Sequence, residues 1–140
     1  MIQLKPYLVF NGNCEEAFLF YKNVFQAEFT YIGRFNEMPN EDGSQLSESD
    51  GNKIMHVTMP IGATELMGSD TNSQSGDVII GSNISISINA QSREEADILF
   101  NGLSADGSVK MPMEDTFWNA YFGMLTDKFG IHWMVNFDVV

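Results

Sequence analysis

One short motif occurs twice in this chain and constrains its fold more than any other feature. Residues 13–21 read NCEEAFLFY, and residues 92–100, 79 positions later, read SREEADILF. Each copy begins with a residue that can cap a helix, Asn13 or Ser92, and has a glutamate three positions later. Apolar residues then follow the i, i+3, i+4, i+7 spacing of one buried helix face: Ala17, Phe20, Tyr21 and Val24, and then Ala96, Leu99, Phe100 and Leu103. The motif predicts a duplicated helix, although two unrelated helices remain an alternative because this type of helix start is common.

The segments around the two helices also correspond. The apolar segment KPYLVF precedes the first helix, and SNISISINA precedes the second. In the latter, Ile84, Ile86 and Ile88 alternate with polar residues, which is typical of a strand with one polar face. Three more strand-like segments follow each helix: FTYIGRF, KIMHVTMPIG and TELMGS, and then SVKMP, AYFGMLTD and GIHWMVNF. The sequence therefore predicts an α+β protein with two βαβββ modules.

Polar segments mark the boundaries of these modules. Residues 68–77, GSDTNSQSGD, are small and polar, as in a linker. We therefore expect one domain over residues 1–140, with modules 1–70 and 78–140 joined by the linker 71–77. Residues 36–52 contain five acidic residues and no basic one, which predicts a solvated loop.

Composition limits the partners and the compartment. The net charge of −12, from 19 acidic and 7 basic residues, repels phosphate backbones and anionic membranes. We therefore expect no nucleic-acid partner and no membrane partner. The single cysteine, Cys14, fits a reducing cytoplasm. The N-terminal segment lacks the pattern of a signal peptide, and no apolar run approaches the roughly 20 residues that a membrane-spanning helix needs. We therefore expect a cytoplasmic protein.

Three segments give the chain a resemblance to a known superfamily. They read PYLVFNGNCEEAFLFYKNVF, IMHVTMPIGATELMGSD and MPMEDTFWNAYFGMLTDKFGIHWMVN. Together with the duplicated module they resemble the vicinal oxygen chelate superfamily, also called the glyoxalase/bleomycin-resistance fold, and most closely its PhnB-like branch. The resemblance implies curved mixed sheets around a cavity and a homodimer. Relatives often carry a demethylubiquinone methyltransferase label, but this sequence has no strand followed by a Gly-rich turn and a helix that would hold an adenosyl cofactor.

The resemblance also implies where a catalytic metal would bind. Metal-dependent members place one ligand on each of four strands, and in this sequence those positions are Pro6, Met67, Asn83 and Met134. None of these is the His or Glu of active metalloenzymes, and thioethers suit only soft ions. We therefore expect no catalytic metal and no other cofactor. If the alignment shifts by two residues, Glu65 and His132 could contribute to a poor site.

Several other residues are candidates for binding. His56 is either a buried histidine with both nitrogens bonded or a donor or base that lines the cavity. Alternation places His132, Met134 and Asn136 on one mixed face of the last strand, which lines the cavity or is simply exposed to solvent. Trp118 either packs in the core or stacks on a ligand. The abundant methionines either fill the core or line a pocket: Met55, Met59, Met67, Met111, Met113, Met124 and Met134.

The first functional hypothesis is a protein that binds an unidentified small molecule without a catalytic metal. Its predicted ligand-binding residues are His56, Met67, Asn83, Trp118, His132 and Met134. The alternative is a metal-dependent lyase, isomerase or dioxygenase of the same superfamily. A third hypothesis is an enzyme without a metal that uses His56 or His132 as its base. Whether the protein is an enzyme remains open at the level of the sequence.

Overall fold

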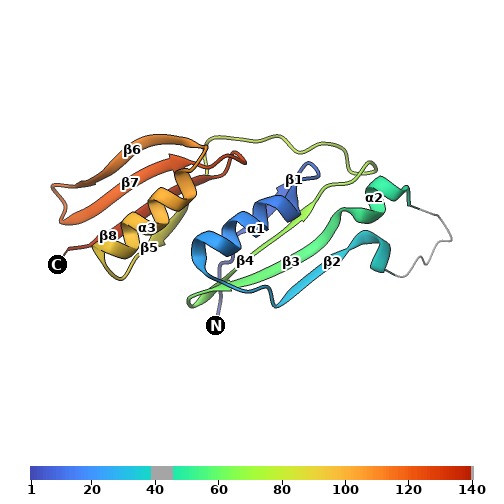
Figure 1. The fold of residues 1–140 in the computed structure, drawn as a ribbon, viewed down its shortest axis with the longest axis horizontal. Coiled ribbons are helices and arrows are strands. Elements are labelled where there is room, and N and C mark those ends of the chain that lie inside the picture. Colours follow the sequence, from blue (N-terminus) through green and yellow to red (C-terminus); the bar gives the residue numbers. More distant parts are fainter. Residues whose placement is uncertain (39–45, 140) are drawn as a thin grey trace. The chain divides into compact units, whose positions relative to one another are not determined.

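The protein forms two compact units. A computed structural model describes residues 1–38 and 46–139. The chain divides into unit 1, Met1–Ile79, and unit 2, Ile80–Val140. Figure 1 shows the helices and strands of each unit along the chain. Within the described ranges, no helix combines the length and the apolar character that crossing a bilayer requires.

Unit 1 is a four-stranded mixed sheet with one long helix. Its elements are β1 (Tyr7–Phe10), α1 (Cys14–Phe25), β2 (Tyr31–Arg34), the 3-10 turn η1 (Phe35–Glu37), α2 (Glu48–Asn52), β3 (Ile54–Ile61) and β4 (Thr64–Asp70). The strand order is β1-β4-β3-β2, with β1 parallel to β4 and the other pairs antiparallel. The prediction of a loop over residues 36–52 is wrong at α2, where Ser47 caps a short helix. Residues 39–45 of that predicted loop lie outside the described part of the chain.

Unit 2 repeats this arrangement. Its elements are β5 (Ile86–Asn89), α3 (Arg93–Ser104), β6 (Ser108–Asp115), β7 (Ala120–Thr126) and β8 (His132–Asp138). The strand order is β5-β8-β7-β6, and β5 is parallel to β8. Both units therefore contain a strand, a helix and three strands in the same order and pairing, which confirms the predicted α+β fold of two βαβββ modules.

The two long helices pack against their sheets through faces that correspond only in part. In α3 the buried residues are the four predicted ones: Ala96, Leu99, Phe100 and Leu103. In α1 the buried residues are Cys14, Ala17, Phe18 and Tyr21, so the predicted burial of Phe20 and Val24 is wrong, because both are only half-buried. Phe18 packs over Gly68 of β4, where a glycine leaves room for its ring. The buried face of α1 therefore depends on Gly68 of β4. The periodicity of the helix sequence alone does not reveal this dependence.

We expect the Gly68→Ala variant to be less stable by about 1–3 kcal/mol, because the added methyl group overpacks this contact. It would lie 2.6 Å from Phe18 Cε1 and 2.8 Å from the Leu8 carbonyl oxygen. Urea denaturation followed by circular dichroism measures the loss. Gly81→Ala is the matched control, because its methyl group would meet only Asn83 Oδ1, at 3.7 Å. Equal stability of the two variants would contradict this account of the packing.

The two helices also begin differently. Ser92 Oγ accepts a hydrogen bond from the Glu95 amide at 3.0 Å, which confirms the predicted cap of α3. The predicted cap of α1 is wrong, because the Asn13 side chain makes no capping hydrogen bond. The carboxylate of Asp70 replaces it: Oδ1 accepts from the amides of Gly12 and Cys14 at 3.0 and 2.9 Å. An acceptor from the end of β4 thus satisfies the first turn of α1, where negative charge is favoured.

A second buried carboxylate organises unit 2. Asp127 is 3% exposed. Its Oδ1 accepts from the amides of Phe129 and Ile131 at 2.8 and 3.0 Å, and its Oδ2 accepts from Trp133 Nε1 at 2.8 Å. Asp127 therefore shapes the turn between β7 and β8 and fixes the indole ring beneath the sheet.

Candidate functional site

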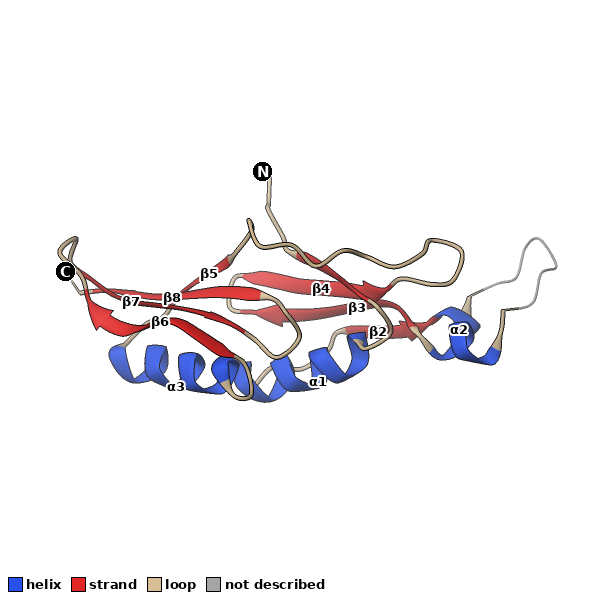
Figure 2. Cartoon of the chain, turned by 90° about the horizontal axis from the view of Figure 1, so that it is seen from above, coloured by secondary structure: helices blue, strands red, loops and turns tan. Residues whose placement is uncertain are grey.

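Within each unit, a helix covers one face of the sheet, and no described helix of the same unit covers the other face. Figure 2 shows α1 against one face of the sheet of unit 1, and α3 against one face of the sheet of unit 2. We call the opposite faces open face 1 and open face 2. Side chains alternate between the two faces of a strand. In β4, Leu66 is buried toward α1, so its neighbour Met67 projects from open face 1.

His56 lies on β3, one of the two inner strands of the sheet, and projects from open face 1. Its Nδ1 is 3.1 Å from the Tyr7 hydroxyl, and its Nε2 is 2.8 Å from the Thr58 hydroxyl. The Tyr7 ring stacks on the imidazole with centroids 5.5 Å apart, and the Tyr31 ring lies 6.0 Å away on β2. Tyr7 and Tyr31 are 45% and 47% exposed. We call Tyr7, Tyr31, His56 and Thr58 the His56 cluster; it presents an imidazole and two phenol rings to solvent.

Strand register brings the His56 cluster together. Tyr31, Thr58, Met67 and Tyr7 are direct partners across β2, β3, β4 and β1, so they share one face. Gly33 is the register partner of His56 on β2. The Tyr31 hydroxyl lies directly over Gly33, at a place where a Cβ would collide with it. The absent side chain therefore makes room for the Tyr31 ring beside the imidazole.

The partners of His56 determine what it can do chemically. A hydroxyl can donate or accept a hydrogen bond, so Tyr7 and Thr58 accommodate either neutral tautomer of His56 and also its imidazolium form. Neither partner is a carboxylate that would fix one tautomer, as a catalytic triad requires. His56 has both nitrogens bonded, as in the structural interpretation, and is also half-buried on an open face, as in the binding interpretation. Its role in binding remains a prediction.

His132 has a different environment on open face 2. Its Nδ1 is 2.8 Å from the Thr126 hydroxyl, and its Nε2 is 2.9 Å from the Gly81 carbonyl oxygen. Because a carbonyl only accepts, Nε2 carries the proton and Nδ1 accepts from Thr126. This pairing holds the backbone at Gly81 against β8. His132 is therefore less suited than His56 to exchange a proton with a ligand.

The predicted alternation in the last strand is confirmed. Trp133 and Val135 of β8 are buried, whereas Met134 and Asn136, which alternate with them on the other face, are half-buried. The Asn136 amide donates to Asn89 Oδ1 and Asp138 Oδ1 at 3.1 and 3.0 Å. Open face 2 therefore has an amide and carboxylate group at one end and thioethers beside it.

Asn83 and Trp118 lie away from the strands of open face 2. The prediction that Asn83 lies on the first strand of the second module is wrong, because β5 begins at Ile86, where its pairing with Trp133 begins. Trp118 occupies the turn between β6 and β7 and is 53% exposed, so it does not pack in the core. Its ring contacts Phe117 and Phe122 at 4.9 and 6.1 Å between centroids.

The residues at the four positions where the superfamily places a divalent metal are not suited to bind such an ion in this protein. Met67 donates its amide to the Pro6 carbonyl at 3.2 Å, so these two positions are neighbours, but neither side chain is a carboxylate or an imidazole. Glu65, the candidate in the shifted alignment, pairs with Lys5 at 2.5 Å. The described residues contain no group of three or more His, Cys, Asp and Glu side chains placed to hold a metal. A hard or borderline ion needs such donors.

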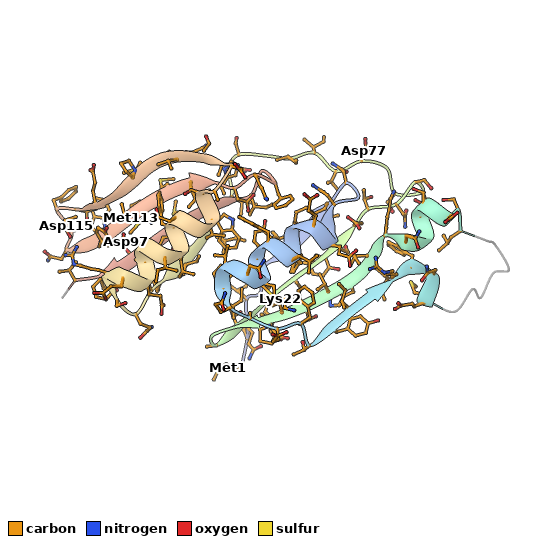
Figure 3. All side chains as sticks on the ribbon, in the orientation of Figure 1. Met1, Lys22, Asp77, Asp97, Met113 and Asp115 are labelled. Atoms are coloured by element: carbon orange, nitrogen blue, oxygen red, sulfur yellow. The ribbon has the colours of Figure 1, made fainter. Side chains whose placement is uncertain are left out.

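Two further titratable residues belong to the packing. Cys14 is fully buried, and its thiol pKa is raised by burial and then by the charges of Asp70 and Glu15, so it is not a reactive nucleophile. Tyr121 donates to Asp97 Oδ1 at 2.6 Å, and this hydrogen bond raises the pKa of Tyr121. Figure 3 labels Asp97 on α3, which anchors this helix to β7.

Tyr7, Tyr31 and Thr58 are site residues that were not predicted from the sequence. Period-two alternation in IMHVTMPI places Thr58 on the same face as His56, so this signal was present. No local pattern pairs either tyrosine with His56, because each lies on another strand. The binding roles of the predicted residues, the homodimer, the cytoplasmic location and the absent cofactors remain predictions.

Comparisons with known proteins give the family. The family model described as 3-demethylubiquinone-9 3-methyltransferase matches residues 3–136. The Escherichia coli protein YjdN is 35% identical over 142 residues, which cover 95% of this chain and 93% of YjdN. The crystal structure of PA1353 from Pseudomonas aeruginosa is 40% identical, with a TM-score of 0.86 over 99% of this chain and 98% of that one. The chain therefore belongs to the family that this model describes, which is the PhnB-like family that the sequence resembles.

More distant structures confirm the fold of this PhnB-like protein. A PhnB protein from Bacillus cereus, named as a putative 3-demethylubiquinone-9 3-methyltransferase, is 27% identical with a TM-score of 0.72 and covers 97% of this chain and 99% of its own. The manganese complex of the fosfomycin resistance protein FosX from Listeria monocytogenes is 14% identical, with a TM-score of 0.63 over 97% and 93% of the two chains. A glyoxalase/bleomycin resistance/dioxygenase family enzyme from Burkholderia phytofirmans is 12% identical, with a TM-score of 0.64 over 97% of each chain. The chain therefore has the fold of the vicinal oxygen chelate superfamily.

The family model is described as a methyltransferase, but the described residues do not form the kind of site that would hold an adenosyl cofactor. Doubly wound folds hold a nucleotide-like cofactor at a helix N-terminus that follows a strand of a parallel sheet. In this protein Asp70 fills the N-terminus of α1, and Ser92 caps that of α3. Each sheet contains one parallel strand pair, β1–β4 or β5–β8. The described residues thus do not fit an adenosyl cofactor bound in this way.

Proposed function

We propose that this PhnB-like protein binds a small organic molecule with a planar ring on open face 1, without a divalent catalytic metal. The observation that carries the proposal is the His56 cluster. An imidazole bonded to two hydroxyls lies beside two half-exposed phenol rings, on a face that no described helix of unit 1 covers. The exposed ring surfaces and the polar atoms beside them are groups that a ligand can contact.

The composition of the cluster indicates the class of ligand. Phenol rings favour offset stacking or edge contacts with another ring, worth roughly 0.5–1.5 kcal/mol for each pair. The imidazole and the hydroxyls of Tyr7 and Thr58 can donate and accept hydrogen bonds. Met67, next to Thr58 in register, adds a flexible thioether that adapts to the shape of a ligand. Because the cluster contains no permanently charged side chain, it favours a planar, largely uncharged molecule.

Fragment screening by NMR tests the proposal. We expect planar aromatic fragments to shift the imidazole resonances of His56, and the Tyr31→Ala variant to bind them about threefold to tenfold more weakly, because a ring contact is lost. Leu19→Ala is the matched control, because Leu19 is 48% exposed on α1. It should bind the fragments like the unmodified protein. Fragments that leave His56 unshifted, or bind both variants equally, would refute the proposal.

A further inference from the structure

Three methionines occupy opposed positions on three neighbouring strands of unit 2. Met111 of β6 is the register partner of Met124 of β7, which is the partner of Met134 of β8. Direct partners project from the same face of a sheet, and Met134 projects from open face 2. We call these residues the thioether row. Neighbouring strands lie roughly 4.8 Å apart, and methionine has three rotatable side-chain bonds, so the outer sulfurs can reach toward the central one.

An irregularity in β6 places Met111 in this row. The register shifts between Val109 and Met111, so Met111 rather than Lys110 pairs with Met124. It shifts again between Met111 and Glu114, so the partner of Glu114 is Phe122 rather than Tyr121. Met113 consequently faces the helix side, where its sulfur lies close to Gly123. In a regular strand Met111 and Met113 would project from the same face. The bulge thus separates a methionine that packs under the sheet from one on open face 2.

The thioether row is not core packing. Met111 is 43% exposed, and Met124 and Met134 are half-buried, whereas the core residue Met59 is fully buried. The fold does not require the row either. The corresponding register row of unit 1 contains Tyr31, Thr58 and Met67, so it has a single thioether. Three accessible sulfurs at successive register positions are a feature of unit 2 alone.

We infer that the thioether row binds one soft monovalent cation, Cu(I). Thioether sulfur is a soft donor that selects Cu(I), whereas carboxylate, carbonyl and water suit the hard divalent ions. The net charge of −12 attracts cations to the protein surface. Glu114 projects from the same face, beside the row, and adds negative potential.

Other soft donors in the described chain compete poorly with the row. The only cysteine, Cys14, is fully buried, so its sulfur is not accessible to an ion in solution. Both nitrogens of His56 and both nitrogens of His132 already have hydrogen-bond partners. The row is therefore the place in the described chain where three neutral sulfur donors share one accessible face.

Anaerobic titration with Cu(I) against a chromophoric chelator tests this inference, with redox-inert Ag(I) and native mass spectrometry for stoichiometry. We expect one ion per chain and at least tenfold weaker binding in Met124→Leu, which removes the central sulfur but conserves volume. Met38→Leu is the matched control, because Met38 is 47% exposed in unit 1. It should keep full affinity. X-ray absorption should show sulfur ligands around the bound copper.

The inference is overturned if the unmodified protein binds no Cu(I), or if the triple variant Met111→Leu, Met124→Leu, Met134→Leu binds it as tightly as the unmodified protein. Circular dichroism verifies that each variant is folded. If Met124→Leu is unfolded, Met111→Leu, at the exposed end of the row, provides the same test. The Tyr31→Ala variant should bind Cu(I) normally, so failure of this inference and failure of the proposed organic-ligand function are distinguishable.

Discussion

Replacing Asp70 with alanine is expected to lower the free energy of unfolding by about 3–5 kcal/mol. The Asp70 side chain is 4% exposed, and its carboxylate accepts from the amides of Gly12, Cys14 and Ile54 at 3.0, 2.9 and 2.9 Å. Alanine leaves these donors without their acceptor, and an unsatisfied buried donor costs roughly 1–3 kcal/mol. The loss affects the start of α1 and the start of β3 together.

Urea denaturation followed by circular dichroism measures this loss. Asp77→Ala is the matched control: it removes the same charge from an exposed position and should change stability by less than about 0.5 kcal/mol. Asp70→Asn should fall between the two variants, because its amide oxygen can still accept but its nitrogen cannot. If Asp70→Ala were as stable as Asp77→Ala, the carboxylate would not hold these elements together.

Replacing Asp127 with alanine should cost a similar amount, about 3–5 kcal/mol, in unit 2. This change removes the acceptor of the Phe129 and Ile131 amides and of the indole of Trp133, which is 2% exposed. Trp133→Phe removes the indole donor and some volume but keeps the turn, so we expect a smaller loss of about 1–3 kcal/mol.

Tryptophan fluorescence during denaturation measures both losses. The chain has two tryptophans. In Trp118→Phe the signal therefore comes from Trp133 alone, and this variant is also the matched control for Trp133→Phe, because Trp118 is 53% exposed. It should change stability by less than about 0.5 kcal/mol. If Asp127→Ala were as stable as Trp118→Phe, the structural role assigned to Asp127 would be wrong.

The two units share one topology, but their open faces present different kinds of side chains. Side chains on the helix side must fit a close-packed core, so they are mostly apolar in both units, and buried polar groups there are hydrogen-bonded, as Asp70 and Asp127 are. Side chains on the open faces have no such constraint. Open face 1 has therefore acquired an imidazole with phenol rings, and open face 2 a row of thioethers. Neither face offers the carboxylate and imidazole donors of the metal-dependent relatives at the four expected positions.

The amino-acid sequence by itself determined the order of the strands and of the two long helices, the duplication, the cap of α3 and the alternation in β8. Each of these follows from neighbours within a few residues: the Ser92 hydroxyl reaches the amide of Glu95, and Trp133 and Met134 face opposite sides because a strand has period two. Hydrogen-bonding reach and backbone period are local properties, so local sequence reveals them.

Only the tertiary structure decided the start of α1, its buried face and the composition of the two open faces. Asp70 replaces Asn13 as the cap, and Gly68 admits Phe18, because β4 lies beside β1 and against α1. Strand register, together with a bulge in β6, selects the partners of His56 and aligns the three methionines. Register depends on the packing of the whole sheet against its helix. Residues far apart in the chain therefore meet at positions that no local pattern reveals.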